Sequence, residues 1–532
     1  MEGPDGGMLP AQAEVRVEMA RIAREGAIPD YLLLAERWAP GRPLLSEGPL
    51  RLTYGDGCRL VYALASSLVE AGMKKGDRVF LCMPNDAVFP LLCNAVWVAG
   101  GAVVVASPLD PESVLAFKLG DCTPRMIYTQ DDPVLVAKLT AANVSGVQLR
   151  LVSPSNPLGV MEGWPDAAGG TSLPTLDPAD MAILQYTGGT TGTPKAVILD
   201  HRNITASVAQ SHGALDFDYG DERAFAAAPF SHIAGLNILI LACSVAAELT
   251  IINRFDPETA VHMITGKRLS YVLGVPTMFN AMLRNGLGNR ADWVGCKYFI
   301  SGGAPIPEEM AAQFHAATGH RLRPAYGLSE TSPGVSLVPG DMSPPPGCAG
   351  LPLQDTEISI RALDDPAIPV APGDRGEICV RGPQVMRGYW GEREENVSVF
   401  VEGGWLRTGD IGWIDANGYL FVVDRLKDII IASGHNVYPA QVEEAIYAHP
   451  AIAEVAVVGA PHDYRGETVR VVAVLKPGAA LDLAELQHFL SDRLSPIEMP
   501  RLLDIVAELP KSPAGKILRR ALRDTAGTPT IA

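Results

Sequence analysis

Hydrophobic positions follow two alternating spacings along the first 300 residues of the chain. Residues 59–72 carry apolar side chains at helical spacing and end in glycine, and the apolar run 77–83 that follows predicts a buried strand. The same pattern predicts a further helix over 87–99, strands over 101–106, 125–129 and 149–153, and a connector rich in Ser, Pro and Gly over 154–178. Helices and strands in this order are typical of doubly wound α/β layers with largely parallel sheets.

The pattern changes after about residue 350. Short alternating strands with glycine turns, within 356–363, 376–382 and 418–424, predict a small antiparallel barrel. A final α+β unit is then predicted, with helices over 440–448 and 483–494 and strands over 454–458 and 469–475. We therefore expect an N-terminal domain of residues 1–424, made of two doubly wound α/β subdomains and a barrel-like part at about 350–424, and a smaller, mobile C-terminal domain of residues 425–532.

Composition narrows the class of protein. With 532 residues, 47% of them hydrophobic and 19% charged, the chain has the composition of an ordinary globular protein with more than one core. Its net charge of −17 argues against a nucleic-acid partner, which would favour a basic surface. Eight scattered cysteines without a C-x-x-C pair favour reduced thiols in a cytoplasmic protein.

The N-terminal residues and the apolar stretches predict no membrane segment. The first ten residues lack the features of a secretory signal. The longest apolar stretch, 232–252, is interrupted by Gly235, Asn237 and Glu248, so a buried α/β core is expected there and not a transmembrane helix. Peripheral contact with a membrane and a homodimer are both left open.

The most informative segment is residues 186–197, which read YTGGTTGTPKAV. Glycine amides, threonine hydroxyls and a lysine together favour polyphosphate binding, and a flexible surface turn is the alternative. The expected phosphate-binding residues are Thr187, Gly188, Gly189, Thr190, Thr191, Gly192, Thr193 and Lys195. The segment is not a Walker loop, because Lys195 follows Pro194 and Ala196 stands where the magnesium-binding hydroxyl would be.

This segment resembles the phosphate loop of the adenylate-forming superfamily, which contains acyl-CoA synthetases, amino-acid-activating domains of peptide synthetases and beetle luciferases. Further segments resemble that superfamily in its order: PFSHIAG at 229–235, SGGAP at 301–305, AYGLSET at 325–331, WLRTGDIG at 405–412, DRLKD at 424–428 and LPKSPAGKILRR at 509–520. The resemblance covers roughly residues 50–520 and is nearest to AMP-forming fatty-acyl-CoA synthetases. Two departures, Asp200 and Gln441, do not touch the expected chemistry.

The resemblance implies a role for each matching residue in binding the nucleotide. Gly302, Gly303 and Ala304 would line the adenine, with Gly327 beside them. Tyr326 would stack on the purine, as an aromatic plane can. Asp410 and Arg425 would contact the ribose, since one carboxylate accepts two hydroxyl hydrogen bonds.

It also implies the residues of the chemical steps. Glu330 would hold Mg²⁺, which needs only one or two carboxylates besides phosphate, and Thr331 would face the α-phosphate. Lys516 would bridge the substrate carboxylate and the α-phosphate as the catalytic cation. His232 would lie beside the acyl group, although a histidine buried in the core is the alternative.

Two further positions belong to the motion between the two half-reactions. Lys427 would be the hinge between the domains. Gly434 would line the passage for the pantetheine arm of CoA after the domain has turned.

The implied activity is that of an AMP-forming acid–thiol ligase, which uses ATP, CoA, Mg²⁺ and a fatty, medium-chain or aryl carboxylic acid. The alternative is a free-standing acyl- or amino-acid-adenylating enzyme that loads a carrier-protein thiol. Such an amino-acid enzyme would place an aspartate near the substrate ammonium, and only Asp216 and Asp218, upstream of the expected segment, are available. No motif in the sequence indicates the oxygen chemistry of a luciferase. A non-catalytic nucleotide sensor would need neither Lys516 nor Glu330.

Overall fold

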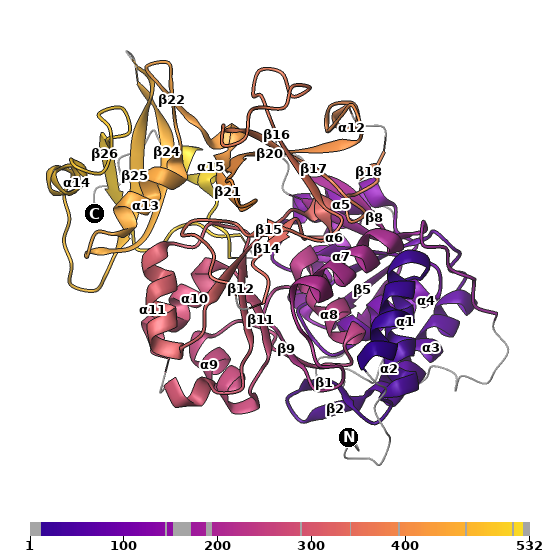
Figure 1. The fold of residues 1–532 in the computed structure, drawn as a ribbon. Helices are drawn as coiled ribbons and strands as arrows, with labels where there is room; N and C mark the ends of the chain where they lie inside the picture. Colours follow the sequence, from indigo (N-terminus) through magenta and orange to yellow (C-terminus); the bar gives the residue numbers. More distant parts are fainter. Residues whose placement is uncertain are drawn as a thin grey trace.

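The computed structural model describes residues 12–143, 146–152, 172–187, 194–287, 290–340, 342–391, 394–462, 465–512 and 515–524. Four β-sheets organise these residues, two of them in the N-terminal part of the chain, and helices cover their faces (Figure 1). The predicted mixed α/β fold is confirmed, and the large sheets are mainly parallel.

A seven-stranded sheet carries the predicted phosphate-binding segment near one edge. Its order is β18-β8-β7-β4-β3-β5-β6. The strands are β3 (Arg78–Cys82), β4 (Ala102–Ala106), β5 (Met126–Gln130), β6 (Leu149–Val152), β7 (Met181–Thr187), β8 (Lys195–Asp200) and β18 (Gly388–Tyr389). Strands β7 and β8 are antiparallel, with Thr187 opposite Lys195, and residues 188–194 lie between them in the sequence. Of these, residues 188–193 lie outside the described part of the chain.

A nine-stranded sheet lies beside the first, in the order β15-β14-β13-β12-β11-β9-β10-β1-β2. Its strands are β1 (Pro43–Glu47), β2 (Leu50–Thr53), β9 (Arg223–Ala226), β10 (Glu248–Ile251), β11 (Tyr271–Gly274), β12 (Tyr298–Gly302), β13 (Leu322–Tyr326), β14 (Ser336–Leu337) and β15 (Leu351–Pro352). The neighbours β12 and β13 are parallel, so Gly302 and Tyr326 end at the same edge. Ligands commonly bind at this carboxyl edge of parallel strands.

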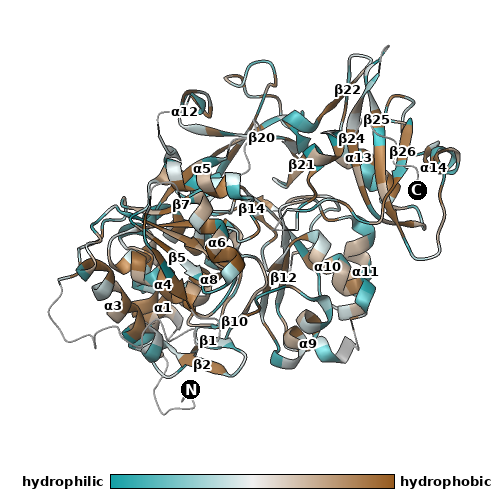
Figure 2. Cartoon of the chain, turned by 180° about the vertical axis from the view of Figure 1, so that it is seen from behind, coloured by the Kyte–Doolittle hydropathy of each residue, from teal (hydrophilic) through white to brown (hydrophobic). Residues whose placement is uncertain are grey.

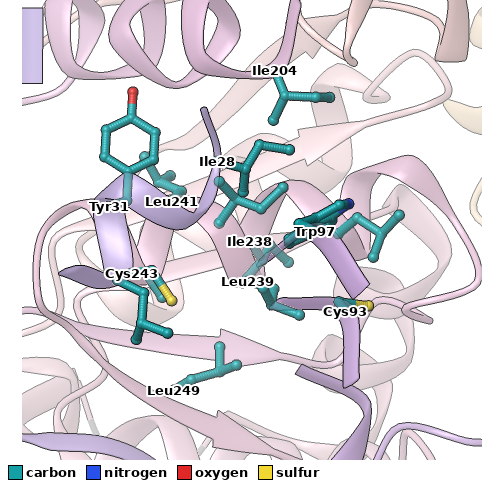
Figure 3. Packing of buried hydrophobic residues seen from close by; sticks show 14 of the residues in the cluster. Ile28, Tyr31, Cys93, Trp97, Ile204, Ile238, Leu239, Leu241, Cys243 and Leu249 are labelled. Atoms are coloured by element: carbon teal, nitrogen blue, oxygen red, sulfur yellow. The ribbon is translucent and has the colours of Figure 1, made fainter. Parts of the chain in front are cut away.

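Helices of the N-terminal part pack on and between the two sheets. They are α1 (Gln12–Glu25), α2 (Pro29–Trp38), α3 (Tyr54–Glu70), α4 (Val88–Val98), α5 (Glu112–Cys122), α6 (Pro133–Ala142), α7 (His201–Ala214), α8 (Ile233–Ser244), α9 (Pro257–Lys267), α10 (Pro276–Asn285) and α11 (Glu308–Thr318). The side chains of α8 are buried almost all round, as the apolar stretch 232–252 predicts. Figure 3 shows Ile238, Leu239 and Leu241 of α8 in the same buried cluster as Trp97.

Burial follows the hydropathy of the elements. Helix α8 and the strands near it are largely hydrophobic, whereas hydrophilic segments lie on outer helices such as α9 and α11 (Figure 2). The Trp97 indole N–H, buried in this core, donates to the Ala182 carbonyl oxygen at 2.8 Å, so its one polar group is satisfied. All eight cysteines are buried and free of disulfides, as the sequence predicts.

A five-stranded antiparallel sheet replaces the predicted barrel. Its order is β16-β17-β20-β19, with β21 paired to β20, and this path does not close within the described residues. The strands are β16 (Glu357–Arg361), β17 (Gly376–Arg381), β19 (Phe400–Val401), β20 (Trp405–Ile414) and β21 (Leu420–Arg425), and the short helix α12 (Glu395–Ser398) precedes β19. The three strands predicted for this region are present, and the correction concerns only their closure.

The residues after β21 form a separate sheet with its own hydrophobic core. Its strands are β22 (Ile430–Ala432), β23 (His435–Val437), β24 (Ile452–His462), β25 (Gly466–Leu475) and β26 (Leu502–Ile505), and its helices are α13 (Pro439–Tyr447), α14 (Leu483–Leu490) and α15 (Arg519–Asp524). We call residues 425–524 the C-terminal part. In Figure 1 it lies next to α10 and α11. The Asn280 amide of α10 donates to the Ala453 carbonyl oxygen at 3.3 Å across this junction.

Two predicted helices differ from the observed ones at their ends. Helix α3 begins at Tyr54, before the predicted start, because Thr53 and Asp56 form a capping box. Helix α14 ends at Leu490, before the predicted end at 494. None of the described helices combines the length and apolarity needed to cross a bilayer.

Candidate active site

A single large cleft brings most of the predicted site residues together. It has a volume of about 3030 Å³ and lies where the carboxyl ends of β12 and β13 face the C-terminal part. The predicted residues that line it are Thr187, Lys195, His232, Gly302, Gly303, Ala304, Tyr326, Gly327, Glu330, Asp410, Arg425, Lys427 and Lys516. Two described residues, Thr331 and Gly434, do not line it, and residues 188–193 lie outside the described chain.

The predicted adenine and ribose residues are joined by a hydrogen bond. The Tyr326 hydroxyl donates to a carboxylate oxygen of Asp410 at 2.8 Å. Asp410 and Arg425 are paired opposite each other on β20 and β21, and their side chains form an ion pair at 3.4 Å. Burial raises the pKa of Asp410, and the Arg425 charge opposes that shift. The tyrosine ring and the carboxylate are therefore held side by side, as one site for a nucleoside would need.

Backbone packing explains the glycine after the tyrosine. A Cβ at Gly327 would collide with the Pro333 carbonyl oxygen, which is rigid backbone. Any residue larger than glycine would therefore push apart the two segments, at Gly327 and Pro333, that flank the turn with Glu330. This turn is the 3-10 helix η3 (Ser329–Thr331), and the Met386 amide donates to the Glu330 carbonyl oxygen at 2.8 Å.

The strand β18 connects Glu330 to β8, at the end of the predicted phosphate-binding segment. Its Tyr389 hydroxyl donates to the Glu330 carboxylate at 2.9 Å, and its backbone pairs with β8. The Lys195 ammonium at the start of β8 lies 5.5 Å from the centre of the Tyr389 ring and 3.0 Å from a carboxylate oxygen of Glu395. Lys195 is therefore at the cleft but is paired with a carboxylate. A phosphate would have to compete with Glu395 for its ammonium.

Thr331 is the last residue of this turn and does not line the cleft. Its side chain is fully buried. The hydroxyl accepts from the Leu328 amide at 2.9 Å and has the carbonyl oxygens of Leu328 and Pro333 within 3.1 and 3.2 Å. In this structure the hydroxyl stabilises the turn that presents Glu330, and direct contact with the α-phosphate stays a prediction.

His232 lines the cleft where the acyl group is predicted to bind. It caps the N-terminus of α8, where its Nδ1 accepts from the Ala234 amide at 3.2 Å. Burial and, to a smaller extent, the Lys516 charge lower the pKa of His232 to about 3, so the ring is neutral at physiological pH. Beyond it, the cleft reaches Ser207 of α7, Leu273 of β11 and Gly334.

Lys516 comes from the far end of the chain and packs directly on the Gly303 backbone. A Cβ at Gly303 would lie 2.6 Å from Lys516 Cε and 3.2 Å from its Nζ, so only glycine permits this approach. Burial lowers the pKa of Lys516 to about 8; the Arg425 charge also lowers it, whereas Asp410 and Glu330 raise it. The ammonium thus lies at the end of β12, among the predicted nucleotide residues.

The two residues predicted for the domain motion lie in different elements of the C-terminal part. Lys427 is exposed, in the short 3-10 helix η4 (Leu426–Asp428) that follows β21. Gly434, with φ of +79°, lies at the exposed turn between β22 and β23. Their predicted roles require another arrangement of the C-terminal part and stay predictions.

Comparisons with known proteins agree with this site. A family model described as AMP-binding enzyme matches residues 35–390, and a model described as AMP-binding enzyme C-terminal domain matches residues 441–516. The chain belongs to the AMP-binding enzyme family. The predicted superfamily is confirmed.

Members of the AMP-binding enzyme family with curated names are similar over most of the chain. A long-chain-fatty-acid–CoA ligase from Bacillus subtilis (strain 168) is 35% identical over 91% of this chain and 91% of its own length. A feruloyl-CoA synthase from Amycolatopsis sp is 34% identical over 92% of this chain and 96% of its own. The predicted class of activity, an AMP-forming acid–thiol ligase, is therefore confirmed at the level of these relatives, which differ in the acid they use.

Solved structures of the family are similar in fold. ATP-bound MatB from Rhodopseudomonas palustris is 27% identical, with a TM-score of 0.86 over 94% of this chain and 99% of that one. The o-succinylbenzoate CoA synthetase MenE from Bacillus subtilis, in complex with an acyl-adenylate, is 27% identical, with a TM-score of 0.82 over 93% and 98% of the two chains. MenE has also been solved with ATP and a magnesium ion.

The acidic residues of this AMP-binding enzyme fit magnesium that arrives with ATP. Among the described residues, no group of three or more His, Cys, Asp and Glu side chains could hold a metal ion. Glu330 offers a carboxylate to the cleft with the Tyr389 hydroxyl as its neighbour. Mg²⁺ commonly keeps its waters and binds one or two carboxylates plus substrate phosphates, so a single glutamate suffices.

Sequence reasoning missed two residues that support this family's site. Tyr389, which bonds Glu330, lies 59 residues from it in the chain. Thr277 of α10 donates to the Gly515 carbonyl oxygen at 2.9 Å, next to Lys516. Both contacts join residues far apart in the chain, so no local pattern in the sequence predicts them.

Proposed function

We propose that this chain is an AMP-forming carboxylate–CoA ligase that acts in two steps. In the first, a carboxylate oxygen of the acid attacks the α-phosphorus of ATP, the bond from that phosphorus to the β-phosphate oxygen breaks, and pyrophosphate leaves. In the second, the sulfur of CoA attacks the acyl carbon, the bond to AMP breaks, and the thiol proton goes to solvent. The products are acyl-CoA, AMP and pyrophosphate.

The observation that carries this proposal is the position of Lys516. Its ammonium packs on Gly303 at the carboxyl end of β12, close enough to His232 to shift the pKa of that histidine. A cation between the acyl end and the nucleotide end of the cleft can draw the carboxylate and the α-phosphate together and stabilise the charge that develops on phosphate oxygens. A pKa of about 8 keeps most of this lysine protonated at pH 7.

The other cleft residues support binding of the nucleotide. The Tyr326 ring and the Asp410 carboxylate, held together at 2.8 Å, suit a purine and its ribose. Glu330 is the residue that would hold Mg²⁺, which when bound supplies positive charge to the phosphate oxygens. Lys195 and residues 188–193 would grip the phosphates that leave as pyrophosphate.

We propose that the domain boundary lies between Asp424 and Arg425, with residues 1–424 and 425–532 as the two domains and Lys427 as the hinge. The separate core of the C-terminal part and its few polar contacts with α10 and α11 support a unit that can turn. After adenylation, rotation of the C-terminal domain about Lys427 would withdraw Lys516 and bring Gly434 toward the path of CoA. The proposal needs neither a second subunit nor a membrane, because one chain supplies every residue named for the cleft.

We also infer a cytoplasmic enzyme, since eight buried thiols without disulfides suit a reducing compartment. The substrate would be a fatty, medium-chain or aryl carboxylic acid. The long-chain and feruloyl names of the relatives and the largely apolar inner cleft support that range.

A panel of carboxylic acids tests the proposal. The purified chain is given ATP, Mg²⁺, CoA and one acid at a time, with long-chain, medium-chain and aryl acids and an amino-acid set, and AMP and acyl-CoA are measured together. We expect equal amounts of AMP and acyl-CoA with at least one fatty or aryl acid. AMP without acyl-CoA for every active acid would instead indicate a carrier-protein thiol as acceptor and would contradict the ligase.

A further inference from the structure

The loop that carries Lys516 is held by bonds within itself. Lys511 and Ile517 form an antiparallel bridge, and the Ser512 amide donates to the Lys516 carbonyl oxygen at 2.7 Å. The Gly515 amide donates back to Ser512 at 2.8 Å. The Lys511 ammonium also pairs with Glu454 of β24 at 2.8 Å, so the described residues of the loop are fixed to the C-terminal part, and their placement over the cleft depends on what the loop touches there.

The loop touches the N-terminal part at Thr277, near the start of α10. The Thr277 hydroxyl donates to the Gly515 carbonyl oxygen at 2.9 Å. Gly515 has φ of +78°, and a Cβ there would lie 3.1 Å from both Thr277 Oγ1 and Val275 Cγ2. The fit is close enough that Gly515, directly before Lys516, has little freedom against α10.

The Lys516 side chain itself has no comparable tether. In the described chain its ammonium makes no hydrogen bond or ion pair, and it rests on the Gly303 backbone. A four-carbon side chain with free rotation is positioned mainly by the backbone that carries it. The contact of Thr277 with Gly515 is therefore the nearest polar contact that fixes Lys516 relative to the nucleotide residues.

We propose that Thr277 is a positioning residue for adenylation, which holds the Gly515 carbonyl so that Lys516 reaches the reacting phosphate in the first half-reaction only. This inference rests on the proposed function. The bond joins two parts of the chain that the second half-reaction is proposed to separate, so it exists only while the lysine is in place. Its loss should slow the first step and leave the second unchanged.

Helix α10 offers a matched control on the same face. Asn280, one turn after Thr277, donates to the Ala453 carbonyl oxygen of β24 at 3.3 Å. Arg284, a further turn along, lies 3.7 Å from Glu454 of the same strand. Positions 280 and 284 thus dock the body of the C-terminal part, whereas Thr277 alone among the three touches the lysine loop. Removing the Asn280 amide weakens docking without releasing Gly515.

The experiment compares Thr277→Val, Thr277→Ser and Asn280→Ala with the natural chain. The first half-reaction is followed as pyrophosphate release with acid and ATP but without CoA, and the second as acyl-CoA formed from supplied acyl-adenylate. We expect Thr277→Val to slow pyrophosphate release about fivefold to tenfold, the usual effect of one lost hydrogen bond. Thr277→Ser should restore it to within about twofold, and all variants should form the thioester at the natural rate.

A pH profile separates positioning from general destabilisation. The groups that shift the pKa of Lys516 are Arg425, Asp410 and Glu330, and burial in the cleft is the largest cause of its value of about 8. The nearby His232 ring is neutral, so it does not titrate in the same range. A lysine released by Thr277→Val should regain solvent, so the alkaline limb of the first half-reaction should move upward from about 8. The alkaline limb should stay at its natural position for Asn280→Ala.

Each outcome decides between the possibilities. Equal slowing of both half-reactions, or Thr277→Val with natural rates and an unmoved alkaline limb, would overturn the positioning role. If Asn280→Ala moved the limb as far as Thr277→Val, docking in general and not this bond would place the lysine, which also overturns it. Failure of the proposed function is distinct, because the natural chain would then release no pyrophosphate with any acid.

Discussion

Replacing Gly303 with alanine should disable the first half-reaction by displacing Lys516. The added Cβ would lie 2.6 Å from Lys516 Cε, whereas carbon atoms pack at about 3.5–4.0 Å, so the lysine tip must move by roughly 1 Å. A misplacement of that size can cost about 100-fold in rate. The φ of +81° at this position adds about 1–2 kcal/mol of backbone strain, which lowers stability but does not act on the chemical step.

The assay is pyrophosphate release with a substrate acid and no CoA, with thioester formation from supplied acyl-adenylate as the second readout. We expect release to fall about 100-fold and thioester formation to change by less than about threefold. Gly302→Ala is the matched control, because a Cβ there meets only the Ala325 carbonyl oxygen, at an ordinary 3.5 Å. Because Gly302 is itself predicted to line the adenine, the rates are compared at saturating ATP, where this variant should release pyrophosphate within about threefold of the natural chain.

A double-mutant cycle tests whether the effect acts through the lysine. Gly303→Ala added to Lys516→Ala should cause little further loss, because residues in contact are not additive. The reasoning would be refuted by Gly303→Ala with release within threefold of the natural chain, or by a full 100-fold additional loss without the lysine.

Three further results are expected. The rate of pyrophosphate release should fall as pH rises through about 8, because deprotonation removes the Lys516 charge, which is about nine-tenths present at pH 7; a flat rate from pH 7 to 9.5 would contradict this. His232 should contribute no step between pH 5 and 8 in the same profile, since its pKa is about 3, and His232→Gln should leave the profile's shape unchanged. Tyr389→Phe should raise the KM for Mg-ATP about threefold to tenfold by removing the hydrogen bond to Glu330, and an unchanged KM would show that this bond does not orient the carboxylate.

Local patterns in the sequence predicted the elements well. The strands at 78–82, 102–106 and 126–130 lie within one residue of their predicted bounds, because a buried strand leaves a clear apolar run in the sequence. Helix ends that are fixed by side-chain caps were harder to predict from the sequence. The capping box of Thr53 and Asp56, for example, starts α3 before its predicted first residue. Whether the antiparallel sheet closes into a barrel could not be predicted from the sequence, because closure depends on pairing between strands far apart in the chain.

In the candidate site, too, local motifs were predicted well and contacts between distant residues were not. Motifs placed Tyr326, Asp410 and Lys516, and the structure gathers all three at one cleft. What the sequence could not supply is the partner of each group: the Tyr326 hydroxyl on Asp410, 84 residues away, and Thr277 against Gly515, 238 residues away. Such contacts follow from the packing of whole sheets and helices, so no local pattern of residue types predicts them.

The central claim is that Lys516 serves adenylation and not thioester formation, and one variant measures it directly. Lys516→Ala is assayed for pyrophosphate release from ATP and a substrate acid, and for acyl-CoA formed from supplied acyl-adenylate and CoA. The account predicts that release falls by at least about 100-fold while acyl-CoA forms at close to the natural rate. Natural pyrophosphate release by this variant would contradict the account.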